Sequence, residues 1–302
     1  MNYYNEIKNK LIDNEIYCKV KDYSKDRNTV ITYYEIGKLL SEAGGKYGDN
    51  IIVEYSKKLV IEVGKKYNKR TLFRMKQFYS VFCDKKVSPL ATQLTWSHYV
   101  ELLPIKNKNE IEYYIEQSIK LNLSRNELRN RIKNKEYERL SEETKCKLFN
   151  KEEVKIKELV KNPILISNKY NYEVISEKIL QKLILEDIPS FLKELGSGFT
   201  FIDNEYKIKL GNTYNYIDLL LYNIDYNCYV VIELKITELK KEHIGQIEIY
   251  MNYIDNNLKK VNQNNTIGII ICKKNNKYII EYCSDDRIIA KEYELVWFKA
   301  IC

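Results

Sequence analysis

Apolar residues recur three and four positions apart through the first 140 residues, which is the spacing of amphipathic helices. The pattern predicts helices over residues 29–43, 50–64, 71–82, 90–103 and 109–121, and a further helix that begins after Ser124. Gly44 and Gly45 are predicted to end the first of them, because glycine readily adopts the left-handed conformation found at helix ends. Residues 1–28 are weaker in helical character and predict an arm or a partly ordered helix. The first 140 residues are therefore predicted to form an all-α domain.

Further along the chain the pattern changes to short runs of branched and aromatic residues, which suit a pleated and half-buried surface. A charge-rich stretch over residues 141–165 predicts a linker or a connecting helix. Helical spacing returns over residues 172–195. Strands are then predicted at 199–202, 206–210, 214–222, 229–236, 266–272, 278–282 and 293–298, with Asn204 and Glu205 as a turn and a helix after Thr237. This order predicts an α/β domain over residues 166–302.

The strands at 214–222 and 229–236 are joined by a short segment with Asn223, Asp225 and Asn227, residue types that favour turns. If the turn is centred between residues 225 and 226, the hairpin register places Asp218 directly opposite Glu233. Like charges that face each other across a ladder are destabilising. A divalent cation would compensate, because Mg²⁺ is commonly held by one or two carboxylates with waters and substrate phosphates.

Strand alternation places Lys235 on the same face as Glu233, about 6.6 Å further along the strand. Two acids and an ammonium group around a metal suit phosphodiester hydrolysis, in which the cation activates water and the lysine offsets charge. Gln246 is predicted on the following helix, at the edge of its buried stripe of Ile244, Ile247, Met251 and Ile254. The competing interpretation is that Glu233 and Lys235 form a simple exposed ion pair.

These residues carry a resemblance to a known family. Asp218, the run Glu233-Leu234-Lys235 and Gln246 resemble the D…(D/E)xK…Q signature of the PD-(D/E)xK nuclease superfamily. The surrounding sequence is similar to the YhcG-like bacterial branch in the segments FLKELGSGF, YIDLLLY, VVIELKI and IGQIEIYMNYID. Elsewhere in the chain the same similarity is found in YYEIGKLL, RTLFRMKQFY, QLTWSHYVELL and IGIIIC. The similarity spans roughly residues 30 to 285.

The resemblance implies a restriction-endonuclease-like α/β core with a central mixed sheet, and nucleic acid as the substrate. It implies Mg²⁺ as the cofactor, with Mn²⁺ as a substitute, held by Asp218, Glu233 and the backbone carbonyl of Leu234. Many superfamily members carry a further glutamate on the helix before the first core strand, where this chain has Gln181. Glu177 and Glu186 lie nearby, and the sequence does not choose between them.

Excess positive charge is confined to the first half of the chain. Lysine and arginine outnumber aspartate and glutamate by 29 to 20 in residues 1–150, whereas the counts in residues 151–302 are 21 and 22. The most basic interval surrounds the predicted helix from residue 71, and its cations Lys69, Arg70, Arg74 and Lys76 are candidates for binding nucleic-acid phosphates. The alternative is that they form only the solvated face of an amphipathic helix.

Cysteine and histidine offer little competing chemistry. The seven cysteines have no metal-site spacing and predict reduced thiols in a cytoplasmic protein. His98 is predicted to be a packing or capping residue and His243 a surface residue. No apolar run approaches the length of a membrane span.

The sequence therefore predicts a metal-dependent endonuclease that cuts double-stranded or branched DNA, in which the helical domain binds nucleic acid or confers specificity. A homodimer is expected, because duplex cleavage needs two active sites or two encounters. The departure at Gln181 leaves a second hypothesis open. In that hypothesis the chain is an inactive accessory subunit that keeps the nuclease fold and binds nucleic acid or protein.

Overall fold

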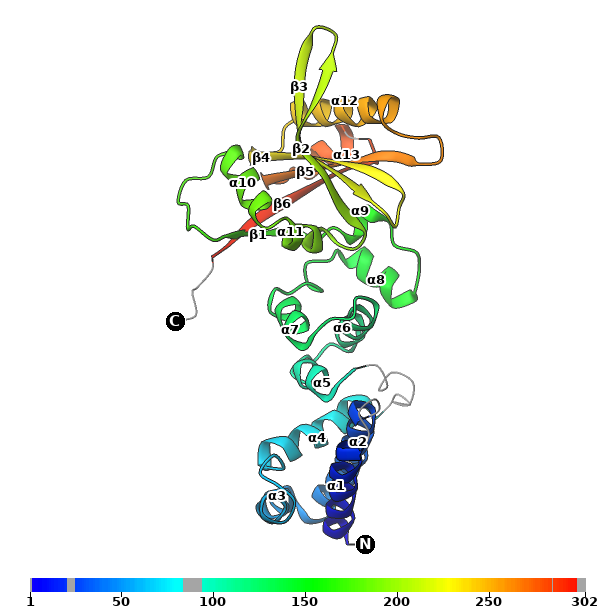
Figure 1. Cartoon of the computed structure of the whole chain (residues 1–302), viewed down its shortest axis with the longest axis vertical. Helices are drawn as coiled ribbons and strands as arrows, with labels where there is room; N and C mark the ends of the chain where they lie inside the picture. The colour runs from blue at the N-terminus through cyan, green and yellow to red at the C-terminus, as the bar shows by residue number, and fades with distance from the viewer. Residues whose placement is uncertain (1, 21–24, 84–93, 284, 298–302) are drawn as a thin grey trace. The chain divides into compact units, whose positions relative to one another are not determined.

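The computed structural model describes residues 2–20, 25–83, 94–283 and 285–297. The chain divides into two compact units, Met1–Tyr137 and Glu138–Cys302 (Figure 1). Within the described residues, no helix is long and apolar enough to cross a lipid bilayer.

The first unit is helical throughout its regular structure. Its elements are α1 (Tyr3–Val20), α2 (Lys25–Tyr47), α3 (Asn50–Glu62), α4 (Lys69–Phe82), α5 (Trp96–Leu102), α6 (Lys108–Lys120) and α7 (Arg125–Lys133). The predicted helix over 90–103 is described only from residue 94, and its first four residues lie outside the described part of the chain. The weak pattern before residue 28 corresponds to the well-formed helix α1, which buries Ile7 and Leu11.

The predicted end of α2 at Gly44 and Gly45 is wrong. The helix continues to Tyr47, and the amide of Gly48 donates to the carbonyl of Gly44 at 2.8 Å. Gly48 has a φ of 78°, so it is this glycine that supplies the left-handed residue at the helix end. Another glycine of α2, Gly37, has a packing role, since a Cβ atom there would overlap the carbonyl oxygen of Met75 on α4.

The second unit is built on a six-stranded sheet. Its helices are α8 (Glu142–Asn150), α9 (Ile156–Leu159), α10 (Glu177–Glu186), α11 (Ile188–Leu195), α12 (Lys241–Asn257) and α13 (Lys277–Cys283). Its strands are β1 (Ile164–Asn168), β2 (Phe199–Leu210), β3 (Thr213–Asn223), β4 (Cys228–Glu238), β5 (Asn264–Lys274) and β6 (Ile288–Trp297), in the spatial order β1-β6-β5-β4-β3-β2.

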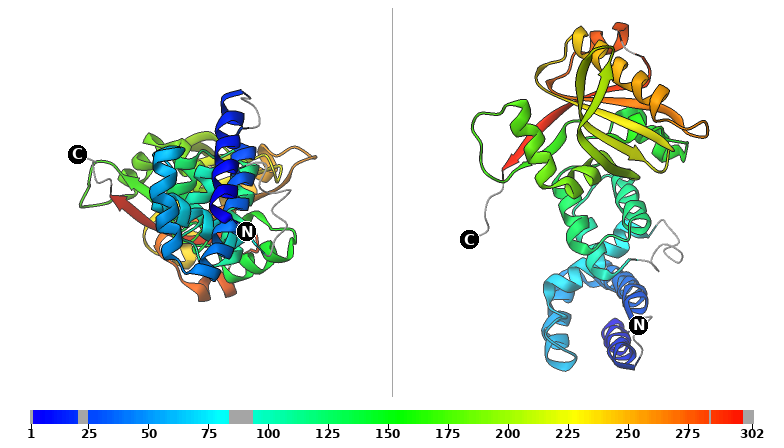
Figure 2. Two further views of the ribbon diagram at one scale, coloured as in Figure 1. Left: turned by 90° about the horizontal axis from the view of Figure 1, so that it is seen from below. Right: turned by 45° about the horizontal axis from the view of Figure 1, so that its top comes forward.

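The sheet is mixed, which confirms the predicted fold class. Strands β2, β3 and β4 pair antiparallel, whereas β4, β5, β6 and β1 pair parallel. One face buries a core with α10 and α11, and the other buries a core with α12 (Figure 2). Gly268 on β5 lets α12 approach closely, because a Cβ atom there would lie 2.6 Å from the sulfur of Met251.

Several predicted elements of this unit are wrong. The first strand is β1, which begins inside the stretch predicted as a linker, and within the described residues its one partner is the remote β6. The predicted strands 199–202 and 206–210 form the single strand β2, interrupted by a bulge between Phe201 and Asp203. Residues 278–282 belong to the helix α13. The adjacent residues Ile279 and Ile280 both pack against the α12 core, which suits one face of a helix and not the alternation of a strand, while Tyr278 and Tyr282 are largely exposed.

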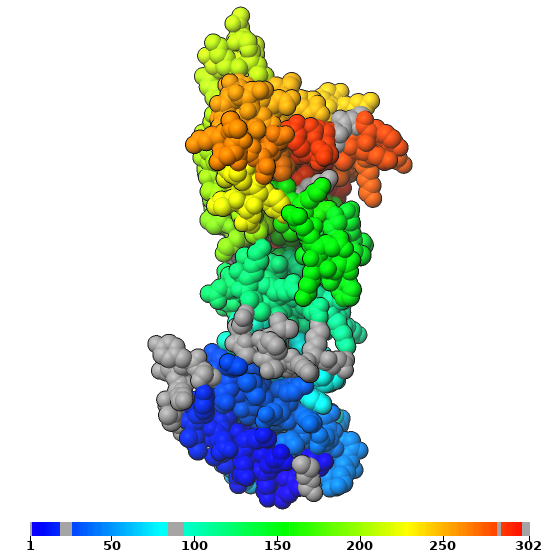
Figure 3. Space-filling model, turned by 90° about the vertical axis from the view of Figure 1, so that its right-hand side faces the viewer, coloured from blue at the N-terminus to red at the C-terminus, as the bar shows by residue number. Residues whose placement is uncertain are grey.

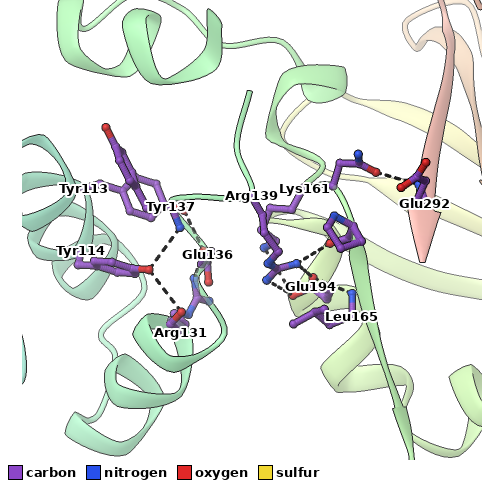
Figure 4. A network of polar contacts seen from close by, with 12 residues as sticks. Tyr113, Tyr114, Arg131, Glu136, Tyr137, Arg139, Lys161, Leu165, Glu194 and Glu292 are labelled. Carbon is purple, nitrogen blue, oxygen red and sulfur yellow. Dashed lines mark hydrogen bonds and ion pairs between the residues drawn. The ribbon is translucent and has the colours of Figure 1, made fainter. Parts of the chain in front are cut away.

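Buried polar networks stabilise each unit separately (Figure 4). In the first unit, Glu136 accepts from Tyr113 at 2.8 Å and from Arg131 at 2.9 Å. In the second, Arg139 forms an ion pair with Glu194 and donates to the carbonyl of Pro163 at 2.7 Å. Glu194 also accepts from the amide of Leu165 at 3.0 Å, which ties α11 to the start of β1.

Candidate active site

The hairpin of β3 and β4 has the predicted register. Leu219 pairs with Ile232 and Asn223 with Cys228, so the next position along would set Asp218 against Glu233. The regular pairing ends at Leu219. The Asp218 carboxylate instead accepts a hydrogen bond from the backbone amide of Leu234 at 2.7 Å. This bond fixes the Asp218 side chain against β4, next to Glu233.

Glu233 is almost completely buried, with 1% of its surface exposed. Its neighbour Val231 packs with the α12 core and Leu234 with the opposite core, so alternation turns Glu233 toward the α12 side. Burial, followed by the negative charge of Asp218, raises the pKa of Glu233 to about 7. One carboxylate oxygen, Oε1, has no hydrogen-bond partner among the described residues. A buried carboxylate oxygen without a partner is costly and indicates a missing cation or donor.

Lys235 supplies the one ion pair that Glu233 makes within the described structure. Its Nζ lies 3.0 Å from the Oε2 atom of Glu233, and the lysine side chain is 12% exposed. Burial lowers the pKa of Lys235, but the negative charges of Glu233, Glu177 and Asp218 outweigh it and leave the pKa raised. Burial likewise raises the pKa of Asp218, against the opposing effects of the Leu234 amide and Lys235.

Helix α10 carries Glu177, Gln181 and Glu186, which lie at different distances from the site formed by Asp218, Glu233 and Lys235. The Oε2 atom of Glu177, the first residue of the helix, is 4.0 Å from Nζ of Lys235. Gln181, one turn later, is buried and donates to the backbone carbonyl of Asp218 at 3.1 Å. Glu186 ends the helix, where it pairs with Lys182 at 3.8 Å. Of the two acidic candidates, Glu177 is therefore the one beside the site.

Helix α12 carries Gln246 as predicted, and its buried stripe is confirmed. The helix begins at Lys241 rather than directly after Thr237. The Gln246 side-chain amide donates to the hydroxyl of Tyr250 at 3.0 Å. Burial raises the pKa of Tyr250, and the charges of Glu233 and Asp218 raise it further, which places this hydroxyl within electrostatic range of the acid pair.

Tyr250, Glu205 and His243 extend the site beyond the predicted residues. Glu205 faces Asp218, since the flanking pairs are Asn204 with Leu219 and Tyr206 with Ile217, and its charge contributes to the raised pKa of Asp218. His243 is part-buried and its Nδ1 accepts from the amide of Lys240, so it caps α12. Burial and then Lys235 lower the pKa of His243. Of these three residues, only Tyr250 could have been found from the sequence, because it lies four residues after Gln246 on the predicted helix.

The donor set fits a divalent cation held by two carboxylates. Among the described residues, no group of three or more histidine, cysteine, aspartate or glutamate side chains is arranged as a metal site. Asp218 and Glu233 nevertheless interact, and the partnerless Oε1 atom of Glu233 is a ligand of the hard oxygen type that Mg²⁺ prefers. A cation between these carboxylates would offset the burial that raises both pKa values and the charge of Asp218 that raises the pKa of Glu233 further.

The four cations predicted to bind nucleic acid have different environments within the first unit. Lys76 forms an ion pair with Asp49 at 2.6 Å, and Lys69 lies over the ring of Phe73. Arg70 and Arg74 form no ion pair in the portion of the chain that the structure describes. Burial and then the charge of Arg70 lower the pKa of Arg74 against the opposing charge of Glu101, so positive charge is in excess around Arg74.

Two arginines of α7 lie next to this cluster. Glu101 of α5 accepts from Arg125 at 2.8 Å and from Arg129 at 2.8 and 3.0 Å, and these bonds lower its pKa to about 2. Arg125 is within electrostatic range of Arg74. The other histidine, His98, completes the capping box with Thr95 and contacts the carbonyl of Leu123 at 2.9 Å, which confirms its predicted capping role.

An acid opposite an E-x-K strand, in a mixed sheet flanked by helices, defines a nuclease of the PD-(D/E)xK class. Residues 157–300 match the family model described as the YhcG PDDEXK nuclease domain, and residues 17–139 match the one described as the DUF1016 N-terminal domain. The two matches together span most of the chain, which therefore belongs to the YhcG-like nuclease family.

The chain is also similar to one curated protein and, over part of its length, to solved structures. The chain is 22% identical over 309 aligned residues to the protein of Escherichia coli (strain K12) named "Putative nuclease YhcG", with 87% of this chain and 82% of that protein covered. A repair endonuclease from Pyrococcus abyssi aligns at 21% identity and a TM-score of 0.28, covering 42% of this chain and 49% of its own. EndoMS in its complex with double-stranded DNA aligns at 18% identity and a TM-score of 0.29, covering 43% and 48%. The match thus spans about half the length of these solved chains.

Proposed function

We propose that this nuclease hydrolyses phosphodiester bonds of DNA with a divalent cation, Mg²⁺ or in its place Mn²⁺, held by Asp218 and Glu233. The observation that carries the proposal is the buried acid pair, in which Glu233 has a pKa raised to about 7 and a carboxylate oxygen without a partner. An acid pair of this kind is costly to fold unless a cation binds it. The carbonyl of Leu234, the residue between Glu233 and Lys235, is a third candidate ligand.

Each remaining group of the site has a defined task in this proposal. When bound, the cation would polarise the phosphate and lower the pKa of water. Lys235 keeps its proton, because three acids surround it, and its ammonium group offsets the charge that develops on the phosphate oxygens. Gln246, held by the Tyr250 hydroxyl, presents its amide to water or to a backbone phosphate. Gln181 positions the main chain of Asp218.

The helical unit is proposed to bind the DNA backbone. Arg70 and Arg74 lie four residues apart on α4, where like charges repel, and neither forms an ion pair in the described part of the unit. Arg125 and Arg129 are both held by Glu101, whose charge also acts on Arg74, so one glutamate offsets three arginines. Phosphate groups supply the missing negative charge, and arginine binds them in bidentate fashion. This assigns the contact to arginines of two helices rather than to Lys76.

Plasmid cleavage tests the catalytic proposal. The full chain is incubated with supercoiled plasmid and Mg²⁺, Mn²⁺ or EDTA, beside Glu233→Gln and Lys235→Ala. Nicked or linear product is expected only with wild type and metal, and rates are expected to fall by a factor on the order of 100 or more in either variant. The control is the exposed acid-lysine pair Glu186→Gln/Lys182→Ala, which leaves the rate unchanged. Metal-dependent cleavage that survives Glu233→Gln would reject this site.

Two observations favour the alternative of an inactive accessory subunit. Gln181 stands where many members of the superfamily carry a carboxylate, and among the described residues no group of three or more histidine, cysteine, aspartate or glutamate side chains is arranged to hold a metal ion. In that case wild type binds DNA without cutting it under any metal. Gln181→Glu then discriminates further, because a third carboxylate beside Asp218 is expected to create or raise cleavage if the metal site is merely incomplete.

Two smaller proposals accompany this function. A homodimer is expected to make both cuts of duplex cleavage, which light scattering of the purified chain measures. A cytoplasmic location is expected from the scattered thiols, since Cys18, Cys83, Cys146, Cys228 and Cys272 are all free.

A further inference from the structure

The distal part of the β2–β3 hairpin extends beyond the point at which β3 stops pairing with β4. Strands β2 and β3 pair from Tyr206 with Ile217 to Leu210 with Thr213, whereas the last regular β3–β4 pair is Leu219 with Ile232. Within the described residues this segment is thus a ribbon of only two strands. Its tip projects beyond the remainder of the second unit in the ribbon and space-filling views (Figures 1 and 3).

The two faces of this ribbon differ sharply. The inner face buries Ile208 and Ile217, which pack with the core beneath α12. The outer face presents Tyr214 and Tyr216, which are 54% and 52% exposed. Directly across the ladder, Lys209 pairs with Tyr214 and Lys207 with Tyr216, and both lysines are exposed. The Nζ atom of Lys207 lies 3.9 Å from the centre of the Tyr214 ring.

This outer face is continuous with the active site. Alternation along β3 places Tyr214, Tyr216 and Asp218 on one face, with steps of about 6.8 Å between neighbours. Leu220 on this face and Ile217 on the opposite face both pack in the core beneath α12, so the ribbon rotates about its axis between them and the face that Asp218 presents at the active site becomes the outer face toward the tip. Glu205 lies across from Asp218 at the base of the ribbon, and its charge acts on the Asp218 carboxyl. Acids therefore occupy the base, where a cation is proposed, and lysines occupy the distal part, where phosphates would be attracted.

Stability alone does not account for two half-exposed tyrosines here. A two-stranded ribbon is marginal on its own, and the inner face already supplies its burial. Exposed aromatic rings interleaved with cations are instead the features of surfaces that bind single-stranded nucleic acid, where bases stack on rings and cations follow the backbone. Bases in a paired duplex are stacked on one another, so they are not available to these rings.

We propose that the outer face of this ribbon binds a single-stranded segment of the DNA substrate and leads it to Asp218. Tyr214 and Tyr216 stack on unpaired bases, while Lys207 and Lys209 contact backbone phosphates. The proposal rests on the nuclease function proposed above and names its substrate class. That class is DNA with an unpaired portion beside the cut, such as a tail, gap or branch, in preference to continuous duplex.

Binding without metal separates this proposal from catalysis. Fluorescence anisotropy in EDTA measures the affinity of the full chain for a labelled DNA oligonucleotide in single-stranded, fully paired and tailed-duplex forms. Tyr214→Ala/Tyr216→Ala is expected to weaken binding of the single-stranded and tailed forms by about 5- to 100-fold per lost stacking contact. The fully paired form is expected to be unaffected. Tyr214→Phe/Tyr216→Phe keeps the rings and is expected to bind as wild type does.

A matched control comes from α13 of the same unit. Tyr278 and Tyr282 are even more exposed, at 74% and 75%, and Tyr278→Ala/Tyr282→Ala is expected to leave all three affinities unchanged. Lys207→Gln/Lys209→Gln is expected to reduce the slope of log affinity against log salt by about 1.4, because each phosphate contact with a single strand contributes about 0.7.

The outcomes distinguish the ribbon from the nuclease. If wild type cuts DNA but the alanine pair binds and cuts every form as wild type does, the ribbon proposal is overturned and the nuclease stands. If no metal supports cleavage but the alanine pair loses single-strand binding, the nuclease fails and the ribbon stands. Equal losses for paired and unpaired DNA, or tighter binding of RNA of the same sequence, would also overturn the proposed substrate class.

Discussion

Replacing Glu233 by glutamine tests the physical basis of the active site without relying on cleavage. Glutamine has nearly the shape of a protonated glutamate, so the change removes a buried negative charge while the packing is kept. In the metal-free protein, burial and Asp218 raise the pKa of Glu233 from its usual 4.5 to about 7. The folded state therefore holds this proton more tightly than the unfolded state does, and ionisation of Glu233 opposes folding.

The size of this effect on the free energy of unfolding follows from the rise of the Glu233 pKa from 4.5 to about 7. A raised carboxyl pKa means that the stability is fully present below pH 4.5 and is lost as the pH rises through about 7. The interval corresponds to roughly 3 kcal/mol, as an order of magnitude for a group this deeply buried. In EDTA at pH 8, Glu233→Gln is thus expected to be more stable than wild type by up to about 3 kcal/mol, relative to their difference at pH 4.

Urea unfolding followed by tryptophan fluorescence measures this difference. The chain has two tryptophans, and Trp297 is the one in the second unit, so both proteins are compared in a Trp96→Phe background. Titration with Mg²⁺ at pH 8 is expected to stabilise wild type, because the cation binds only the folded acid pair. The same titration is expected to leave Glu233→Gln largely unchanged.

Two results would refute the reasoning. A wild-type protein whose stability does not fall between pH 4.5 and 8 relative to Glu233→Gln would show that the ionised carboxylate is not destabilised by its surroundings. Equal stabilisation of both proteins by Mg²⁺ would place the cation elsewhere.

Three further predictions concern other parts of the molecule. Gly37→Ala is expected to destabilise the first unit by about 1–3 kcal/mol in urea unfolding, because the added carbon meets the backbone of Met75, whereas Gly45→Ala, in open space, is not. Tyr250→Phe is expected to slow cleavage about 5-fold through the lost hydrogen bond to Gln246, with no additional loss when Gln246→Ala is combined with it. Glu101 has a pKa lowered to about 2, so its stabilising contribution is present above pH 4.5 and lost as the pH falls toward 2. Acid unfolding of Glu101→Gln is expected to lack this loss, which is about 1–2 kcal/mol because its arginine partners are half-exposed.

Local sequence was sufficient for most helices of the first unit, apart from α1 and the end of α2, and for the central hairpin. The period of its apolar residues identified the helices, and the turn residues between β3 and β4 fixed a register that the structure reproduces. Both signals arise from residues close together in the chain, which is why they can be predicted without knowing the rest of the fold.

Tertiary structure decided the features that depend on distant segments. Residues 164–168 form the strand β1 because β6, more than a hundred residues later, pairs with them. No pattern in the neighbouring sequence predicts this pairing. The choice between Glu177 and Glu186 depended on which end of α10 meets Lys235.

The chemical character of Glu233 is also a tertiary property. Its sequence neighbours give the E-x-K pattern, but β5 and α12 bury the carboxylate, and burial is what raises its pKa and leaves Oε1 without a partner. Sequence thus determined which acid and lysine share a strand face. The folded surroundings decided that ionising this acid in the absence of a cation costs free energy, because desolvation is set by the atoms that enclose a group rather than by its neighbours in the chain.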